Sequence, residues 1–261
     1  MSNRLTLLGT GTSFGVPQIG CQCPVCHSSD PRDHRFRTAA LLETPVGSIL
    51  IDTPPELRLG LLAAGVSRID AVVFTHEHAD HVAGIDDLRI FSVKNRAPLP
   101  VFASAATANF LTAGYRYIFD EDVVPIPGTS KPRLTIERVQ AGTPFRAAGV
   151  EVLPIGFAHG PIEVLGFRVG RMAYLTDVKA VPDETLGLLR GLDLLVLNAL
   201  WWRSHPTHLS IPEAIDTARR IGAQRTVLTH LTHETGHAEL AAALPDGVEP
   251  GYDGLILEIA P

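Results

Sequence analysis

Three histidines and one aspartate lie within a stretch of seven residues, Thr75-His76-Glu77-His78-Ala79-Asp80-His81. His76 and His78 stand two residues apart directly after an apolar run, so in an extended loop both side chains can project to the same side. Asp80 and His81 follow where a helix is expected to begin. Neutral imidazoles together with a carboxylate suit Zn²⁺, Mn²⁺ or Fe²⁺. We interpret the segment as a metal site; the alternative is a solvated, histidine-rich turn.

Three further candidate ligands each follow an apolar run of the kind that forms a buried strand. His159 comes after the run 152–155, Asp177 after 172–175 and His230 after 226–228. Active-site residues of α/β enzymes gather at the carboxyl ends of strands. Each of these residues taken alone would be an ordinary surface or core side chain more often than a ligand. As a set, they predict one site shared with the histidine-rich segment.

All three cysteines of the chain, Cys21, Cys23 and Cys26, fall within one hexapeptide. An odd and tightly clustered set does not form a disulfide framework, and the spacing favours three thiolates around one metal ion. A tetrahedral structural site then needs a fourth ligand. His27 is the nearest histidine, although so short a link would constrain its ring. Inert buried thiols are the alternative interpretation.

The elements that must position these side chains are strands alternating with helices. A strand is expected at 5–8, and further strands are expected at 38–42, 48–51, 71–74, 152–155, 172–175, 194–197, 226–228 and 255–259. Several are continuous apolar runs, as expected for strands buried on both faces. Thr53-Pro54-Pro55-Glu56 and Ser210-Ile211-Pro212-Glu213 each have the pattern of a capped helix start. The mixture predicts a layered α/β architecture.

Composition sets the limits within which this site is interpreted. The chain has 261 residues, of which 45% are hydrophobic and 19% charged, which suits a single sizeable domain. The net charge of −6 argues against a nucleic-acid partner and is compatible with a small anionic substrate, because bound cations would make the site locally positive. The first eight residues do not resemble a secretory signal, and no apolar run approaches the ~20 residues of a membrane span. A cytoplasmic protein without membrane contact is expected.

The pattern His-x-His-x-Asp-His, with His159, Asp177 and His230 downstream, resembles the metallo-β-lactamase superfamily over nearly the whole chain. The resemblance implies an α/β fold: a single-domain αββα sandwich over residues 1–261, with a dinuclear site of two Zn²⁺ or Mn²⁺ ions at one edge. By position, one ion would be bound by His76, His78 and His159, and the other by Asp80, His81 and His230. Asp177 would bridge the two ions, and Asp80 is also expected to serve catalysis.

A narrower resemblance covers the opening of the chain. The segments Gly9-Thr10-Gly11-Thr12-Ser13-Phe14-Gly15-Val16-Pro17 and Gly20-Cys21-Gln22-Cys23-Pro24-Val25-Cys26 are similar to the phosphoribosyl 1,2-cyclic phosphate phosphodiesterases of phosphonate degradation. This resemblance implies a structural Zn²⁺ in a Cys-rich loop at about 20–27, with ligands Cys21, Cys23, Cys26 and His233.

The same narrower resemblance implies that a loop histidine, His208 in His205-Pro206-Thr207-His208-Leu209-Ser210, contacts the phosphate. With an ordinary pKa of about 6.5, it could donate a proton near neutral pH. A surface histidine is the alternative. The segment Asn198-Ala199-Leu200, followed by Trp201 and Trp202, departs from that family and leaves the exact substrate open.

The expected function is therefore metal-dependent hydrolysis of a small anionic phosphodiester, such as phosphoribosyl 1,2-cyclic phosphate. Hydrolysis of a thioester or a lactone is the alternative for the same site. Cleavage at the 3′ end of tRNA is a weaker alternative, because the chain has no inserted basic arm and carries a negative net charge. A non-catalytic metal-binding module is disfavoured, because the cysteine site would already serve a structural role. A homodimer is left open as the assembly.

Overall fold

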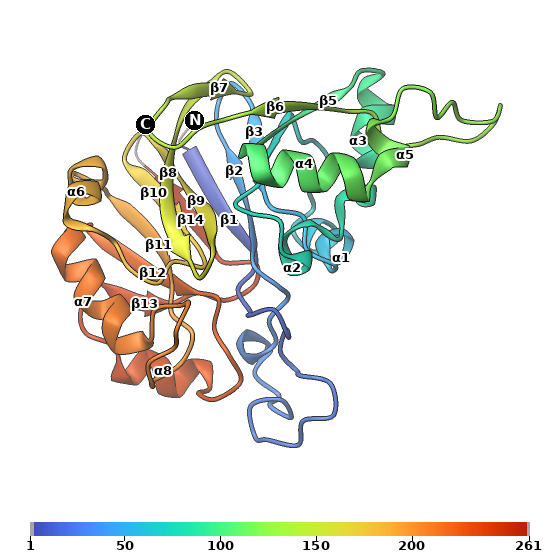
Figure 1. Cartoon of the computed structure of the whole chain (residues 1–261). Helices are drawn as coiled ribbons and strands as arrows, with labels where there is room; N and C mark the ends of the chain where they lie inside the picture. Colours follow the sequence, from blue (N-terminus) through green and yellow to red (C-terminus); the bar gives the residue numbers. More distant parts are fainter. Residues whose placement is uncertain (1–2, 260–261) are drawn as a thin grey trace.

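Two seven-stranded sheets face each other in the computed structural model, which describes residues 3–259 (Figure 1). The first sheet has the order β14-β1-β2-β3-β4-β5-β6, in which β3 to β6 are parallel neighbours. Its strands are β1 (Asn3–Gly9), β2 (Ala39–Glu43), β3 (Ser48–Ile51), β4 (Ala71–Val73), β5 (Leu99–Ala103), β6 (Leu134–Arg138) and β14 (Ile256–Ile259).

The second sheet has the order β13-β12-β11-β10-β9-β8-β7. Its strands are β7 (Phe145–Ala147), β8 (Val150–His159), β9 (Ile162–Val169), β10 (Met172–Leu175), β11 (Leu194–Asn198), β12 (Arg225–Thr229) and β13 (Val248–Pro250). Strands β10 to β13 are parallel neighbours. The carboxyl ends of parallel strands meet at one edge of a sheet, so residues that follow β10 and β12 are brought close together.

Helices cover the outer face of each sheet. The first sheet carries α1 (Leu57–Ala63), α2 (Ala79–Val82), α3 (Arg89–Asn95), α4 (Ala105–Gly114) and α5 (Arg116–Phe119), and the second carries α6 (Asp183–Leu186), α7 (Ile211–Ile221) and α8 (His237–Ala243) (Figure 1). Short 3₁₀ turns occupy Pro31–Asp33, Ile85–Leu88 and Gly187–Leu189. The predicted αββα sandwich is confirmed. In the described part of the chain, none of the helices is long and apolar enough to cross a membrane.

The hydrophobic core has three layers, and β10 shows why its sequence is a continuous apolar run. Met172 and Tyr174 point into the cluster between the two sheets. Ala173 and Leu175 point into the cluster beneath α6, α7 and α8. Alternate side chains of a strand face opposite sides of the sheet, so a strand covered on both faces needs apolar residues at every position.

The strands that the sequence reading did not predict are β5, β6, β7, β9 and β13. Two of them, β7 and β13, are only three residues long. β6 lies at the edge of its sheet and has mostly exposed or half-exposed side chains, so it lacks an apolar run. β9 contains Gly166, where a Cβ would meet the side chains of Leu175 and Phe157, so a larger residue would force these side chains to move.

The two predicted helix starts have different outcomes. Ser210 caps α7, because its side chain accepts from Glu213 N–H while the Glu213 carboxylate accepts from Ser210 N–H. The capped start at Thr53 is wrong, since α1 begins only at Leu57. Thr53 Oγ1 instead donates to Val82 O at 3.2 Å, and the carboxylate of Glu56 pairs with Arg37. Both side chains are used in tertiary contacts that local sequence does not reveal.

Candidate metal-dependent active site

Seven side chains from four separate segments converge at one edge of the sandwich. The loop after β4 carries His76 and His78, and α2 carries Asp80 and His81. The other three residues stand at or just after the ends of β8, β10 and β12, and they are His159, Asp177 and His230. Donor atoms lie within 4.8 Å of one another in the groups His76/His78/His159, His76/His81/Asp177 and Asp80/His81/His230. The structure therefore brings together every ligand that the sequence predicted for the dinuclear site.

Three residues at this edge adopt a left-handed backbone conformation. Asp177 and His230 both have a φ of 59°, and Asp52, which follows β3, has a φ of 64°. In the described residues, only Arg96 and Ala148 also have a positive φ without being glycine. Such conformations are costly for residues with a Cβ and concentrate at functional sites. The chain turns abruptly at each strand end, which directs these side chains into the site.

Asp52 forms hydrogen bonds with two residues of the segment 75–81, although the sequence did not identify it as a site residue. Its buried carboxylate accepts from Thr75 N–H and Thr75 Oγ1–H, both at 2.8 Å, and from His81 Nδ1 at 2.7 Å. When a histidine binds a metal ion through one ring nitrogen, a carboxylate hydrogen-bonded to the other ring nitrogen fixes the tautomer and the orientation of the ring. Asp52 follows the predicted strand 48–51, so the strand-end argument applied to Asp177 could also have found it.

The remaining hydrogen bonds determine which ring nitrogens face the site. Because Thr75 Oγ1 donates its only proton to Asp52, its 3.0 Å contact with His76 Nδ1 requires the ring N–H to donate. His159 Nδ1–H donates to the carbonyl of Thr207 at 3.1 Å. The neutral rings of His76 and His159 therefore direct the lone pair of Nε2 into the site, where His76 Nε2 lies 3.0 Å from His78 Nδ1.

Buried nitrogens without partners indicate that this donor set fits a cation. Among the side chains of residues 3–259, His81 Nε2 and both ring nitrogens of His230 are buried without a hydrogen bond. His81 Nε2 lies 3.3 Å from Asp177 and 3.4 Å from Asp80, and His230 Nε2 lies 3.2 Å from Asp177. Leaving such groups unpaired is costly. Imidazole nitrogens and carboxylate oxygens at these spacings are a ligand set for divalent metal ions.

The pKa shifts show that the site favours positive charge. Burial opposes protonation of His81, but the carboxylates of Asp177 and Asp52 raise its pKa well above the usual value. Burial also disfavours the ionised form of Asp177, yet His230 and His81 hold its pKa well below the usual range. The pKa of Asp80 is likewise lowered against burial, by its hydrogen bond with His81. Both aspartates are thus ionised at neutral pH.

His208 lies beside this cluster, in the loop before α7. Its Nε2 is 2.9 Å from Asp177 Oδ1, and its ring packs 4.8 Å from those of His159 and His230. Burial lowers the pKa of His208 to about 4 despite the hydrogen bond to Asp177, so the ordinary value expected for a loop histidine is wrong. The surface-residue alternative does not describe this largely buried ring.

A pocket of about 340 Å³ opens over these residues. It is lined by Ser13, His78, Asp80, His159, Pro161, Ile162, Asp177, Thr207, His208 and His230. Ser13 belongs to the Gly/Thr-rich loop after β1, and Pro161 and Ile162 form the turn between β8 and β9. Sequence reading did not place these three residues in the site, because their types carry no catalytic signal.

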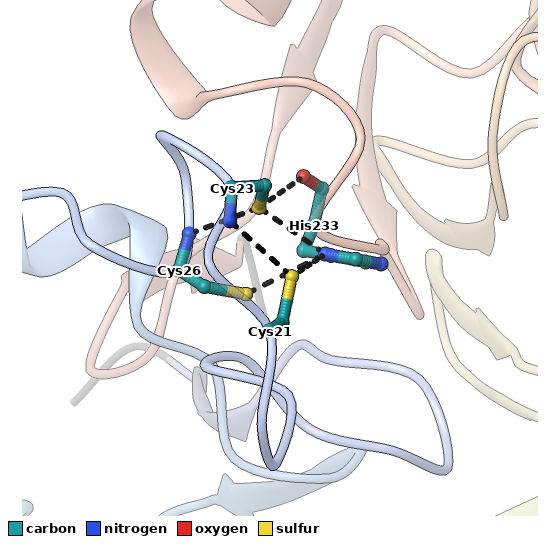
Figure 2. A group of neighbouring side chains, drawn as sticks. All are labelled: Cys21, Cys23, Cys26 and His233. Carbon is teal, nitrogen blue, oxygen red and sulfur yellow. Dashed lines mark hydrogen bonds between the residues drawn. The ribbon is translucent and has the colours of Figure 1, made fainter.

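The cysteines form a second, separate cluster with one distant histidine (Figure 2). His233 Nδ1 lies 3.2, 3.3 and 3.5 Å from the sulfur atoms of Cys21, Cys23 and Cys26, respectively. These distances match the roughly 3.5 Å between neighbouring ligands of a tetrahedral zinc site with Zn–S near 2.3 Å and Zn–N near 2.0 Å. In the described residues the cluster has these four members, and His27 lies outside it.

The three thiols of this cluster differ in their ionisation. A hydrogen bond from Cys26 N–H lowers the pKa of Cys23 to about 6, so Cys23 is a thiolate at neutral pH. Burial raises the pKa of Cys26 to about 11. Three neighbouring thiolates repel one another unless a cation lies between them, so this cluster, too, is suited to a metal ion.

Comparison with known proteins places the chain in a family. The model of the beta-lactamase superfamily domain matches residues 48–231, well over half of the chain. The solved structure of a diphosphatase from the PhnP family is 38% identical, covers 99% of this chain and 98% of its own, and has a TM-score of 0.91. A ribonuclease Z of Mycobacterium sp. (strain KMS) is 28% identical over 99% of this chain and 96% of its own length.

A further relative is longer than this chain. An octanoyltransferase of Porphyromonas gingivalis is 42% identical over 97% of this chain, but the match spans only 51% of that protein. The chain thus corresponds to about half of this relative. Taken with the αββα sandwich and the convergent histidines, the family match shows that the chain belongs to the metallo-β-lactamase superfamily and has its hydrolase fold.

Proposed function

We propose that this protein is a metal-dependent phosphodiesterase that cleaves a small anionic phosphate ester, such as a cyclic sugar phosphate. The observation that carries the proposal is the convergence of seven metal-ligand side chains beside a largely buried histidine in one small pocket. The similarity to a PhnP-family diphosphatase supports chemistry at phosphorus. The name of that relative indicates cleavage of a diphosphate, so a phosphoanhydride is the main alternative substrate class.

The proposed ligand sets follow the geometry of the donor atoms. His76, His78 and His159 would hold one ion, and Asp80, His81 and His230 the other. Asp177 would bridge them, since its carboxylate lies within 4.8 Å of donor atoms of His76 and His159 from the first set and of His81 from the second. When bound, a pair of divalent ions generates a nucleophile from water and neutralises charge on the phosphoryl oxygens. Asp52 and Thr75 keep the ligating histidines in the required tautomers.

The shape and lining of the pocket favour a small substrate. Its volume of about 340 Å³ is near the lower limit for ligand sites, and Pro161 and Ile162 give it one apolar wall. Within the described chain, its lining contains neither lysine nor arginine, so no fixed side-chain cation is present to bind additional phosphate groups. A diester with one negative charge fits this lining better than a polyphosphate does.

His208 is the proposed catalytic residue from the chain itself. Its ring lies at the pocket wall within hydrogen-bond distance of Asp177, where it can contact a phosphate oxygen or the leaving oxygen. With a pKa of about 4 the ring is neutral at neutral pH, so proton donation to an alkoxide leaving group requires that the bound phosphate anion raises this pKa. Such donation typically contributes 10²–10⁴-fold to the rate. Asp80 serves as an ionised ligand at the same wall.

A second candidate function is hydrolysis of an acyl thioester at the same site. The octanoyltransferase relative favours it, because that protein is named for moving an eight-carbon acyl group and contains a region similar to this whole chain. About half of that relative lies outside the match, and its named activity could belong entirely to that other half. The absence of nucleic acid among the substrates stays a prediction, since ribonucleases Z are also relatives.

The test is a substrate panel with purified protein loaded with Zn²⁺ or Mn²⁺. The panel contains bis(p-nitrophenyl) phosphate, a ribose cyclic phosphate, a nucleoside diphosphate sugar, an octanoyl thioester and a precursor tRNA. We expect turnover of the two diesters, which is lost in His76→Ala and retained in His34→Ala, an exposed histidine outside the site. Preference for the thioester, the diphosphate or the tRNA would overturn the proposal.

A further inference from the structure

A tight turn in the Gly/Thr-rich loop after β1 borders the active-site pocket. Gly15 N–H donates to Thr12 O at 2.8 Å, which closes a turn of four residues. Ser13 and Phe14 are the two central residues of this turn. Ser13 lines the pocket, whereas Phe14 does not, although its side chain is 64% exposed. Of the two central residues, Ser13 is therefore the one placed to meet a substrate.

The turn is held against the metal-binding edge by hydrogen bonds on two sides. Thr12 N–H donates to Leu231 O at 3.2 Å, and Leu231 directly follows the proposed ligand His230. On the other side, Arg37 Nε donates to Ser13 O at 2.8 Å. The backbone of Ser13 is thus fixed beside the end of the pocket that carries His230, and its carbonyl group is already paired.

The Ser13 hydroxyl is an unused hydrogen-bond donor at the pocket. In the described part of the chain, two hydroxyl side chains line the pocket, those of Ser13 and Thr207. Thr207 Oγ1 lies 2.9 Å from His208 Nδ1 and is therefore already paired. Within residues 3–259, neither Oγ nor N–H of Ser13 makes a hydrogen bond. Because the lining also lacks lysine and arginine, Ser13 is the neutral donor that this pocket offers to a ligand.

The depth of Ser13 indicates which part of a substrate it meets. Asp177 and His230 are each only 2% exposed, so ions held by them lie at the base of the pocket. Ser13 is exposed and therefore lies at the mouth. A phosphoryl group bound by the ions at the base leaves its ester group toward the mouth. Pro161, which is also exposed there, presents only apolar surface to that group.

We propose that Ser13 is a specificity-determining residue, whose hydroxyl donates a hydrogen bond to an oxygen in the alcohol part of the substrate and thereby selects sugar phosphodiesters over diesters of simple alkyl alcohols. The proposal rests on the proposed function, because it places the phosphoryl group at the ions. A sugar ring carries hydroxyl and ring oxygens next to its phosphate ester, whereas a simple alkyl group carries none. One neutral hydrogen bond corresponds to about three- to tenfold in affinity.

The experiment compares two cyclic diesters as substrates of the metal-loaded protein. One is a ribose cyclic phosphate, and the other is ethylene phosphate, whose alcohol part has no additional oxygen. In Ser13→Ala we expect KM for the ribose ester to rise about three- to tenfold with little change in kcat, and both constants for ethylene phosphate to stay unchanged. Ser13→Thr, which keeps the hydroxyl, should resemble the wild type.

Two control variants separate the hydroxyl from the turn that carries it. Phe14→Ala removes the other central side chain of the same turn, and Ser29→Ala removes an exposed hydroxyl in the cysteine loop. Both should behave like the wild type on both substrates. Equal losses on the two substrates in Ser13→Ala, or the same selective loss in Phe14→Ala, would overturn the role of the Ser13 hydroxyl.

Calorimetric binding tests the same contact without turnover. The metal-loaded proteins are titrated with ribose phosphate and with ethyl phosphate. In Ser13→Ala, Kd for ribose phosphate should rise about three- to tenfold, while Kd for ethyl phosphate and the metal content stay unchanged. The absence of this difference, including a failure of the wild type to bind ribose phosphate, would overturn the role of Ser13. A wild type that cleaves no diester but shows the difference would instead refute the proposed function alone.

Discussion

The histidine cluster and the cysteine cluster are both suited to metal ions, yet they are built in opposite ways. The cysteine cluster has four donors, three from one hexapeptide, and its atoms leave room only for an ion. The histidine cluster takes donors from four segments and opens into a pocket. Structural zinc sites are closed by protein ligands, whereas catalytic sites keep a position open for water or substrate. From this comparison we propose a structural role for the cysteine cluster and a catalytic role for the histidine cluster.

Removing the bridge between the proposed ligand sets should have the largest effect. In Asp177→Ala we expect a loss of roughly 10³-fold or more in kcat, because the variant loses charge neutralisation at both proposed ions. Elemental analysis should fall from about three metal ions per chain to two or fewer, with the cysteine-bound zinc retained. Asp216→Ala, an exposed carboxylate on α7, is the control. Normal turnover with a full metal content would remove Asp177 from the site.

Removing His208 should affect chemistry without affecting metal content. His208→Ala should lose roughly 10²–10⁴-fold in kcat on alkyl diesters, the usual range for general acid catalysis, and far less on p-nitrophenyl esters. Equal losses on both substrates would assign His208 to phosphate binding instead of proton donation. The measurement is steady-state kinetics on both substrates with metal analysis of the same samples.

Breaking the cysteine cluster should affect stability before chemistry. Cys23→Ser and His233→Ala should each release one zinc ion, because binding free energy of a structural metal is also folding free energy. We expect the melting temperature to fall by at least ~5 °C, given about 2–4 °C per kcal/mol for a chain of this size. His27→Ala should match the wild type. A stability loss in His27→Ala but not in His233→Ala would reverse the assignment of the fourth ligand.

The smallest effect should come from Arg203, the side chain that connects the two regions. It pairs with Glu234 beside the cysteine cluster and lies above Trp201, whose ring contacts the loop that carries His208. Arg203→Ala removes a half-exposed ion pair with Glu234 and the support of Trp201, so a two- to fivefold loss of kcat on alkyl diesters is expected, in line with about 0–1 kcal/mol for such pairs. Metal content should not change. Arg219→Ala, on the exposed face of α7, is the control. An unaltered kcat in both variants would show that the two clusters are energetically independent.

The sequence by itself determined the class of fold and which residues are the candidate ligands. The short segment 76–81 contains His76, His78, Asp80 and His81, so their spacing alone indicates a shared site. Strand β10 is apolar throughout because helices cover one of its faces and the first sheet covers the other. Hydrophobic periodicity and ligand spacing are local signals, which can be recognised in the sequence without the tertiary structure. The capping box at Ser210 was predictable for the same reason.

Only the tertiary structure decided which side chains support and orient the predicted ligands. Asp52 joins the site through a left-handed turn after β3 and accepts hydrogen bonds from Thr75 and His81. His233, which the family resemblance had already indicated, lies more than 200 residues from the cysteines in sequence and meets them only in the folded chain. Thr53 and Glu56 have the sequence of a helix start, but hydrogen bonds to α2 and to Arg37 use their side chains elsewhere. Ser13 looks like any loop serine until folding sets its turn against the pocket. These roles depend on contacts between segments that only packing brings together. Apart from the position of Asp52 after a predicted strand, such contacts leave no periodic or spacing signal in the chain.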